Sequence, residues 1–452
     1  MNFNKWVLRF NLIFILLLVL LSLVYPKIIP ARFAALRSPS IFSDVERDSS
    51  AKSGLTKEQQ QNLADRKKGK IIIRDYLSDT AFINASGNVI PLQGLMEKLS
   101  ALKKDKIKKV RIAYFGDSFI EGDLITKDLR EQLQNMFGGS GVGFVPVTSI
   151  TAGFRTSITH GFSSGWNDIN FKSDERKTVN LFLSGHAFFS AGPNEVNYRA
   201  VQHPLLDSFS HMQVLYGMPK DQTSQLQLNI NGTPKIFKPT ALFNTADILL
   251  GSSKAASIST AGSDVPLYGF SFEGESGIVL DNFSFRGITG VEIDNISDDM
   301  LAAISKNRPY DLVVLQYGPN LLFRAELVDF SWYRKMMEPV LKKLKKAFPQ
   351  TDFLLISTAD KGFNYGGEWK TQKGVEPLVD VQYELAHGQG MDFYNLYHSM
   401  GGNGAILKWV NDKPALANRD YTHVNGRGAK RIADYLFTAI INEYHAYDKS
   451  AH

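Results

Sequence analysis

The chain has 452 residues, of which 44% are hydrophobic and 21% charged, so it is long enough for more than one domain and can bury a large core. It contains no cysteine, which excludes disulfides, thiolate metal sites, cysteine catalysis and a lipidated N-terminal cysteine. The formal net charge of +6 is compatible with an acidic polymer or an anionic membrane surface as partner, but it carries no information about the fold.

The amino-terminal segment predicts a membrane anchor. Lys5 and Arg9 flank the start of an apolar run that extends to Tyr25. Counted from Trp6, this run approaches the roughly 20 residues that a helix needs to cross a bilayer. A cleaved signal peptide is the alternative, but the first small residues after the run, at 31–35, are interrupted by an arginine and a phenylalanine. We expect one uncleaved span followed by a polar linker.

The first strand of the soluble part is expected to end at Gly116, directly before Asp117 and Ser118. Helical patterns at 92–102 and 124–137 flank this strand. A turn from strand to helix lifts a serine hydroxyl clear of the sheet, at the carboxyl edge where open α/β sheets bind ligands. The alternative is that Asp117 and Ser118 form a turn and cap the next helix.

A glycine-rich run at 138–143 follows this helix. It lacks the Gly-Lys-Ser/Thr ending of a nucleotide P-loop, and it follows a helix where that motif needs a strand. We expect a turn near the rim of the site instead.

Residues 148–277 predict an inserted β-sandwich. Short β-type runs recur at 179–183, 211–216, 226–230 and 267–272, and Asn231-Gly232 is a strong hairpin signal. Exposed aromatic residues of such a module can stack on sugar rings, although most aromatic residues of a sandwich pack in its core; the candidates are Trp166, Phe188, Phe189 and Tyr198. The module also contains a Gly-x-Ser-x-Gly pattern around Ser163, which lacks the preceding strand and the following helix that the hydrolase elbow requires.

Strands and helices alternate in the rest of the chain, which predicts a doubly wound parallel sheet. The expected strands are 278–285, 311–318, 352–357 and 391–396, and the expected helices are 300–306, 331–348, 375–387 and 428–444.

Asp420 lies three residues before His423, just ahead of the last helix. In a tight turn the carboxylate can bond one ring nitrogen and leave the other facing a serine, which is the arrangement that acyl transfer needs. A surface histidine is the alternative for this pair alone. Each of the residues Ser118, Gly287, Asn320 and His423 follows a predicted strand or precedes a predicted helix. We therefore expect all four at one edge of the sheet.

Four segments together resemble the blocks of the SGNH (GDSL) hydrolases, in family order, over about residues 108–445. They are Gly116-Asp117-Ser118, Arg286-Gly287-Ile288-Thr289-Gly290, Gly318-Pro319-Asn320 and Asp420-Tyr421-Thr422-His423. The resemblance implies a flavodoxin-like, three-layer α/β/α hydrolase domain into which the β-sandwich, similar to a carbohydrate-binding module, is inserted.

The resemblance also implies roles for these residues. Ser118 would be the nucleophile, His423 the general base and acid, and Asp420 its orienting partner. The backbone N–H groups of Ser118 and Gly287 and the side-chain amide of Asn320 would form the oxyanion hole. No metal or other cofactor is expected. The family often has an acidic residue where Leu321 follows Asn320, so support for Asn320 must come from elsewhere.

A finer similarity, carried by residues 116–123, by 395–420 and by the inserted sandwich, is to the peptidoglycan O-acetylesterases. It implies a serine esterase that removes O-acetyl groups from an envelope glycan. The alternatives are an O-acetyltransferase and a non-catalytic glycan-binding protein; no nucleic acid partner is expected, and the oligomeric state is left open.

We expect a single-pass inner-membrane protein with its catalytic domain in the periplasm, or a periplasmic protein if the signal is cleaved. The expected segments are an anchor at 1–36, a linker at 37–75, hydrolase parts at 76–147 and 278–452, and the module at 148–277.

Overall fold

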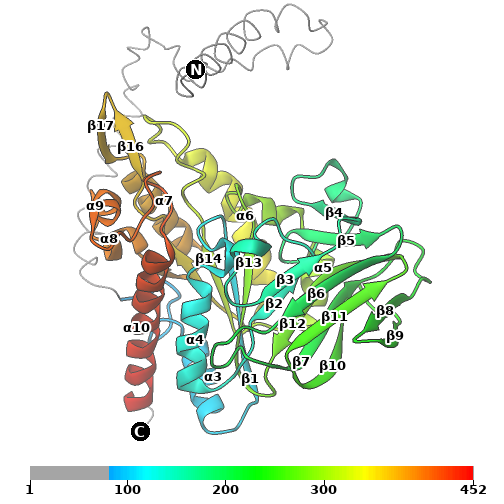
Figure 1. The fold of residues 1–452 in the computed structure, drawn as a ribbon. Coiled ribbons are helices and arrows are strands. Elements are labelled where there is room, and N and C mark those ends of the chain that lie inside the picture. The colour runs from blue at the N-terminus through cyan, green and yellow to red at the C-terminus, as the bar shows by residue number, and fades with distance from the viewer. Residues whose placement is uncertain (1–80, 451–452) are drawn as a thin grey trace, which may run out of the picture. The chain divides into compact units, whose positions relative to one another are not determined.

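A five-stranded parallel sheet forms the centre of the hydrolase part (Figure 1). The structure is a computed structural model that describes residues 81–450. The strand order is β13–β1–β14–β15–β18, and every neighbouring pair is parallel. Numbered along the chain, this order is 2-1-3-4-5, the flavodoxin-like arrangement. The predicted α/β fold with a parallel sheet is confirmed. The strands span Lys109–Gly116 (β1), Gly277–Ser284 (β13), Leu312–Gln316 (β14), Asp352–Ile356 (β15) and Asp392–Tyr394 (β18).

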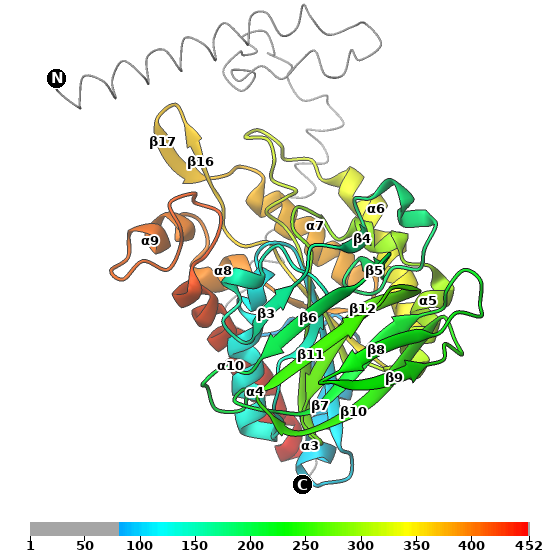
Figure 2. The same ribbon diagram turned by 45° about the vertical axis from the view of Figure 1, so that its right-hand side comes forward.

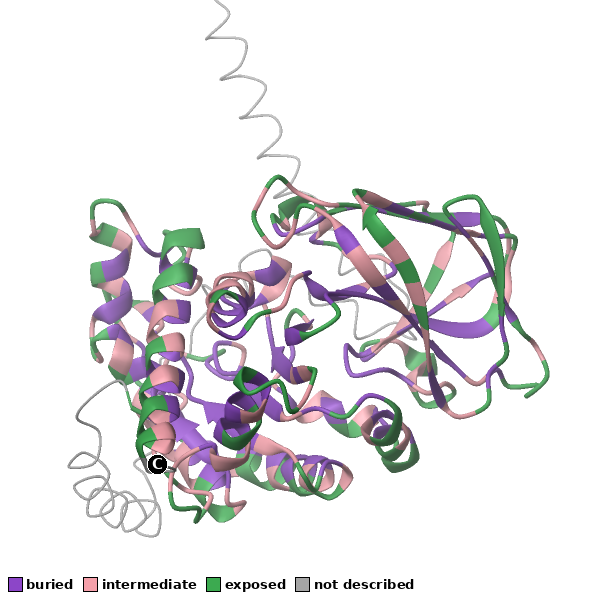
Figure 3. Ribbon diagram, turned by 90° about the horizontal axis from the view of Figure 1, so that it is seen from below, coloured by how far each residue is buried: buried purple, intermediate pink, exposed green. Residues whose placement is uncertain are grey.

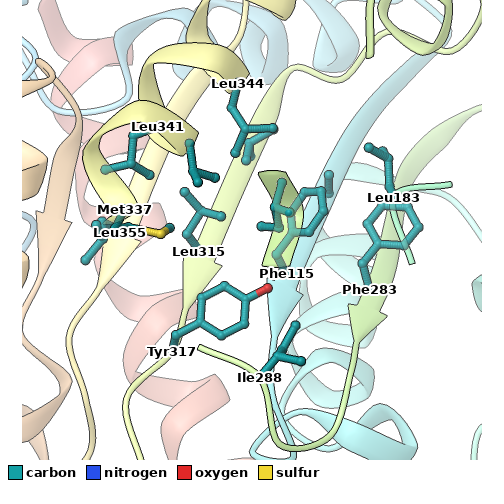
Figure 4. Packing of buried hydrophobic residues seen from close by; sticks show 14 of the residues in the cluster. Phe115, Leu183, Phe283, Ile288, Leu315, Tyr317, Met337, Leu341, Leu344 and Leu355 are labelled. Atoms are coloured by element: carbon teal, nitrogen blue, oxygen red, sulfur yellow. The ribbon is translucent and has the colours of Figure 1, made fainter. Parts of the chain in front are cut away.

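Helices cover both faces of this sheet. Successive side chains of a strand point to opposite faces, and apolar side chains are buried on each face. Tyr114 of β1 packs in the core with α3, α4 and α10, whereas Phe115 packs in the core with α5, α6 and α7. Figure 4 shows the second core, in which Leu315 of β14 lies near Leu341 and Leu344 of α6. The helices span Gln93–Lys103 (α3), Thr126–Phe137 (α4), Asp298–Asn307 (α5), Ser331–Ala347 (α6), Val375–Gly388 (α7), Leu396–Met400 (α8), Ala405–Asn411 (α9) and Gly426–Ser450 (α10).

The inserted module consists of two antiparallel sheets (Figure 2). One has the order β10–β7–β12–β5–β4, with β2 paired to β12, and the other has the order β3–β6–β11–β8–β9. Their strands span Gly143–Pro146 (β2), Thr159–Phe162 (β3), Trp166–Asn170 (β4), His186–Ser190 (β5), Asn194–Arg199 (β6), Phe209–Gly217 (β7), Leu226–Ile230 (β8), Thr233–Phe237 (β9), Phe243–Ser253 (β10), Ala255–Thr260 (β11) and Ser263–Glu273 (β12).

An apolar core lies between the two sheets of the module. In β6, Val196 and Tyr198 are buried while their neighbours are exposed, the alternation expected of a strand with one wet face. The same alternation of buried and exposed residues is visible in the module strands of Figure 3. The predicted hairpin at Asn231-Gly232 joins β8 to β9, and both residues have positive φ (50° and 83°), as a type I′ turn requires.

A buried ion network links the module to the parallel sheet. The Arg308 guanidinium lies 2.9 Å from Glu273 at the end of β12 and 2.7 Å from Asp281 of β13. Arg111 of β1 lies 2.7 Å from the same Glu273. Burial alone would raise the pKa of Glu273, but Arg308 and Arg111 hold it well below its usual range. The contact between the module and the sheet therefore includes an ion network whose central charges, Arg308, Glu273 and Asp281, have almost no contact with water.

Two sequence predictions are wrong. The apolar run at 179–183 is not a strand; its Phe182 is buried among Phe144, Phe243 and Phe283 in a segment that packs against the core. The glycine run at 138–143 is not near the active-site rim. The carbonyl of Gly138 accepts the N–H of Ile278 at 2.9 Å, at the amino end of β13 and hence at the opposite edge of the sheet.

Among residues 81–450, no helix has the length and apolar character needed to cross a bilayer. The predicted anchor at 1–36 and the predicted linker at 37–75 lie outside the described residues.

Candidate active site

Three adjacent strands deliver three of the predicted site residues. Gly287 follows β13, Ser118 follows β1 and Asn320 follows β14, and β1 lies between the other two strands. Because the strands are parallel, these residues leave the sheet at the same carboxyl edge. The boundary between β1 and β14 is also the switch point of this strand order, where flavodoxin-like folds bind their ligands.

The structure brings Ser118, His423 and Asp420 together as a hydrogen-bonded relay. The Oγ atom of Ser118 lies 2.9 Å from Nε2 of His423, and Nδ1 of His423 lies 2.8 Å from Oδ2 of Asp420. Oδ1 of Asp420 accepts the backbone N–H groups of Thr422 and His423, each at 3.0 Å. With Nδ1 donating to Asp420, Nε2 is free to accept the proton of Ser118, as a general base must.

The relay is open to solvent. The side chains of His423 and Asp420 are 39% and 49% exposed. Burial tends to raise the pKa of Asp420, but hydrogen bonds from the backbone of His423 and Thr422 and from the imidazole outweigh it and lower this pKa. Asp420 is therefore ionised at neutral pH, and the histidine is within reach of water and of a bulky substrate.

A hairpin that the sequence analysis missed supports the Asp420–His423 turn. Its strands are Gly362–Tyr365 (β16) and Glu368–Thr371 (β17), and the N–H of Gly362 donates to the carbonyl of Tyr421 at 2.7 Å. Tyr421 has a positive φ of 53°, which is strained for a residue with a side chain. Its ring stacks on Trp369, with centroids 4.0 Å apart and an interplanar angle of 15°. The Gly366-Gly367 pair at the hairpin tip is the signal that could have revealed this element.

The two predicted backbone donors have no competing acceptor. Among residues 81–450, the N–H groups of Ser118 and Gly287 make no hydrogen bond, so both are available to an oxyanion. Gly287 has a φ of 72°, a conformation that glycine adopts without strain.

Asn320, the third predicted donor, already has hydrogen-bond partners. Its Nδ2 already donates to Oδ2 of Asp117 at 3.0 Å and to the carbonyl of Ile288 at 2.9 Å. An amide nitrogen has only two hydrogens, so Asn320 must exchange or share one of these bonds before it binds an oxyanion.

Asp117 is a supporting residue that the sequence analysis treated only as a turn or capping residue. Its side chain is fully buried and accepts the N–H of Phe119 at 2.9 Å as well as the amide of Asn320. Burial raises the pKa of Asp117 to about 6, although the Phe119 N–H and His423 act in the opposite direction. Its place in the first sequence block, directly before Ser118, is the signal that could have indicated this role.

The departure at Leu321 has a structural counterpart. Leu321 is completely buried in the apolar core. The loop that carries Asn320 is bound instead by Lys361, whose Nζ donates to the carbonyls of Pro319 (3.1 Å) and Leu322 (2.7 Å). A cation from a neighbouring loop thus stabilises this segment by backbone contacts.

Several predicted candidates lie elsewhere. Phe188 and Tyr198 are buried in the sandwich core, so neither can stack on a sugar, and the expected core packing holds for both. Trp166 is half-buried and its Nε1 donates to the carbonyl of Glu195 at 3.1 Å, while Phe189 is half-buried against the core. Ser163 donates to Asn194 at 2.7 Å, in the loop between β3 and β4. A strand thus does precede Ser163, contrary to the expectation, but this strand is mostly exposed and a strand, not a helix, follows.

Comparisons with known proteins give matches among solved structures only. No family model and no curated protein matches the sequence. A solved structure of a peptidoglycan O-acetylesterase is 19% identical, covers 82% of this chain and 99% of its own, and superposes with a TM-score of 0.66. An acetyl xylan esterase is 22% identical and covers 36% of this chain and 81% of its own, with a TM-score of 0.29. A family two carbohydrate esterase from Clostridium thermocellum is 11% identical and covers 63% of this chain and 98% of its own, also with a TM-score of 0.29. The chain thus resembles the SGNH hydrolases in its four sequence blocks, and it shares its fold with the peptidoglycan O-acetylesterase.

Proposed function

We propose that this protein is a serine esterase that removes O-acetyl groups from a cell-envelope polysaccharide, with peptidoglycan as the substrate. The observation that carries the proposal is the relay of Ser118, His423 and Asp420, with contacts of 2.9 Å and 2.8 Å beside two unengaged backbone donors. The fold shared with a peptidoglycan O-acetylesterase supports the choice of substrate.

The geometry corresponds to a two-step acetyl transfer. His423 removes the proton of Ser118, whose Oγ attacks the acetyl carbonyl carbon. The N–H groups of Ser118 and Gly287 then stabilise the negative charge on the carbonyl oxygen by hydrogen bonds. The tetrahedral species collapses as the bond to the sugar oxygen breaks and His423 gives its proton to that oxygen, which leaves as a hydroxyl. Water, deprotonated by His423, then attacks acetyl-Ser118 and releases acetate and the free serine.

The exposure of the relay supports water as the second acceptor. A transferase would pass the same acetyl group to a sugar hydroxyl, and it gains from excluding water while the acetyl-serine persists. Because His423 and Asp420 are 39% and 49% exposed, we favour hydrolysis over transfer.

We further propose that residues 1–36 anchor the enzyme in the inner membrane with its catalytic domain in the periplasm. The apolar run that begins at Trp6 supports this proposal.

Acetate release from O-acetylated peptidoglycan tests this function. Ser118→Ala should reduce the rate by at least about 10³-fold, because the nucleophile is lost, while the circular dichroism spectrum and melting temperature stay unchanged. Ser163→Ala is the matched control and should retain full activity, since the hydroxyl of Ser163 donates to Asn194 in the module and not to a residue of the relay. A Ser118→Ala variant as fast as the wild type would refute the esterase.

A second assay separates the alternatives. The full-length protein is incubated with p-nitrophenyl acetate, with and without peptidoglycan lacking O-acetyl groups. Release of p-nitrophenol with free acetate as the sole acetyl product in both reactions supports the esterase, whereas Ser118-dependent acetylation of the glycan would establish the transferase. Glycan binding without either product would leave only a binding protein.

A further inference from the structure

A lysine of the inserted module reaches the segment that carries Gly287. Lys172 lies between β4 and the short 3-10 helix Asp174–Lys177, and its Nζ donates to the backbone carbonyl of Arg286 at 2.8 Å. The same Nζ is 3.1 Å from the point where a Cβ atom on Gly287 would lie. The ammonium therefore sits at the peptide group that joins Arg286 to Gly287.

That peptide group has two functional ends. Its carbonyl oxygen belongs to Arg286 and its N–H belongs to Gly287, and the group is planar because of the partial double bond. Fixing the carbonyl therefore also fixes the direction of the N–H. A cation on the carbonyl draws electron density through the peptide and makes the N–H a stronger donor, as in any chain of hydrogen bonds.

The module packs around this segment from several sides. The ring of Phe285 stacks on His186 with centroids 4.9 Å apart, lies 5.3 Å from the ring of Phe171, and lies 5.6 Å from Nζ of Lys172. The backbone N–H of Lys172 donates to the side chain of Asn170 at 3.0 Å, and this bond holds the backbone from which the lysine side chain extends. The contact with Arg286 is thus part of a built interface between module and hydrolase loops.

The nucleophile loop binds the other side of the same segment. The Arg286 guanidinium makes two contacts with Glu121, at 2.8 Å and 2.5 Å. The N–H of Glu121 contacts the carbonyl of Ser118 at 3.4 Å. Lys172, Arg286 and Glu121 also line one cavity of about 380 Å³, which is bordered by both the module and the hydrolase part.

We propose that Lys172 is a positioning residue of the active site: its ammonium orients and polarises the Arg286–Gly287 peptide so that the Gly287 N–H binds the oxyanion. This inference rests on the proposed esterase function. It assigns a chemical role to the inserted module, which would complete the oxyanion hole in addition to any contact with the glycan.

The absence of cysteine from the chain allows a direct test. Lys172→Cys introduces a single thiol, which 2-bromoethylamine converts into a near-isosteric replacement for lysine that carries an ammonium group. Iodoacetamide converts the same thiol into a neutral side chain of similar size. Lys177→Cys, on the adjacent 3-10 helix, receives the same treatments as the matched control.

Both substrates, p-nitrophenyl acetate and O-acetylated peptidoglycan, are assayed for kcat and KM. Lys172→Cys should lower kcat by about 10-fold to 100-fold with little change in KM, less than the loss of a whole oxyanion donor, which costs about 10²–10³. Aminoethylation should restore kcat to near the wild-type value, and carbamidomethylation should not. The Lys177→Cys variant should have wild-type kcat in all three states.

Three results would overturn the assignment: wild-type kcat in Lys172→Cys, a change confined to KM, or equal rescue by the neutral and the charged modification. The last would show that the lysine only fills space. Failure of the proposed function is recognised separately, because the wild type and Ser118→Ala would then release acetate at the same rate, and the role of Lys172 would fall with it.

Discussion

The hydroxyl of Ser118 lies 2.9 Å from Nε2 of His423, although 305 positions separate the two residues in the chain. The parallel sheet explains this proximity, because it places the ends of β1, β13 and β14 at one edge, and the turn before α10 reaches the same edge. The hydrogen bond to Asp420 then orients the ring.

Asp420→Asn should reduce kcat by about 10²–10⁴-fold, because an amide can stabilise the wrong tautomer of His423 and cannot stabilise the imidazolium. The side-chain oxygen of asparagine can still accept the backbone N–H groups of Thr422 and His423, so the melting temperature should change little. Steady-state kinetics with p-nitrophenyl acetate and a thermal melt measure the two effects. A variant with wild-type kcat would show that Asp420 does not orient His423.

Gly287→Ala should lower both activity and stability. The φ of 72° disfavours alanine by roughly 1 kcal/mol, and the new Cβ atom would lie 3.1 Å from Nζ of Lys172. We expect kcat to fall more than about tenfold, since a misdirected N–H no longer meets the oxyanion. Gly388→Ala is the control, because this glycine has ordinary helical geometry and open space around it. Equal activity of the two variants would contradict the role of Gly287.

Asp117 should make stability depend on pH. Its pKa of about 6 in the folded protein is above the ordinary value of 3.8, so the folded state binds the proton more tightly than the unfolded state. The resulting stabilisation is complete below about pH 3.8 and is lost as the pH rises through 6. The unfolding free energy of the wild type should therefore fall relative to that of Asp117→Asn by on the order of 3 kcal/mol from about pH 4 to 7. Urea denaturation at a series of pH values measures this difference, and parallel profiles would disprove the assignment.

Trp369→Ala should impair catalysis without contacting the reacting atoms. Loss of the stacked ring lets Tyr421 relax from its positive φ, which shifts Asp420 and His423. We expect kcat to fall by several-fold to about tenfold, because misplaced catalytic groups lose the benefit of preorganisation. Trp369→Phe should retain most activity. Trp332→Ala is the control, because it removes a tryptophan of equal exposure, 36%, from α6, and it should leave kcat unchanged. If it lowers kcat as much as Trp369→Ala, the stack of Trp369 on Tyr421 has no specific role.

Arg308→Met should destabilise the protein by about 3–5 kcal/mol, because Glu273 and Asp281 lose a buried cationic partner. Arg334→Met removes an exposed pair with Glu384, in which the two side chains are 49% and 35% exposed. This control should cost no more than about 1 kcal/mol. Chemical denaturation of the two variants measures the contrast, and similar losses would argue against the buried network as the link between module and sheet.

The sequence alone was sufficient to predict the alternation of strands and helices, the β-rich insert and the four loops at one edge of the sheet. These features are local: buried parallel strands such as Leu312–Gln316 are continuous apolar runs, and glycine and asparagine specify the turn at Asn231-Gly232. The roles expected for Ser118, Asp420 and His423 came from the order of the four blocks, and the structure places these three side chains in contact.

Only the tertiary structure decided which distant groups meet. Lys172 and Arg286 are 114 positions apart, and nothing in the spacing of either indicates their contact. An apolar run predicts burial but not the partner that buries it, so the run at 179–183 packs against the core where a strand was expected, and Tyr198 lies inside the sandwich. The engagement of Asn320 with Asp117 and Ile288 likewise depends on three chain segments that fold onto one another. Local patterns determine the elements, and long-range packing determines which side chains face each other.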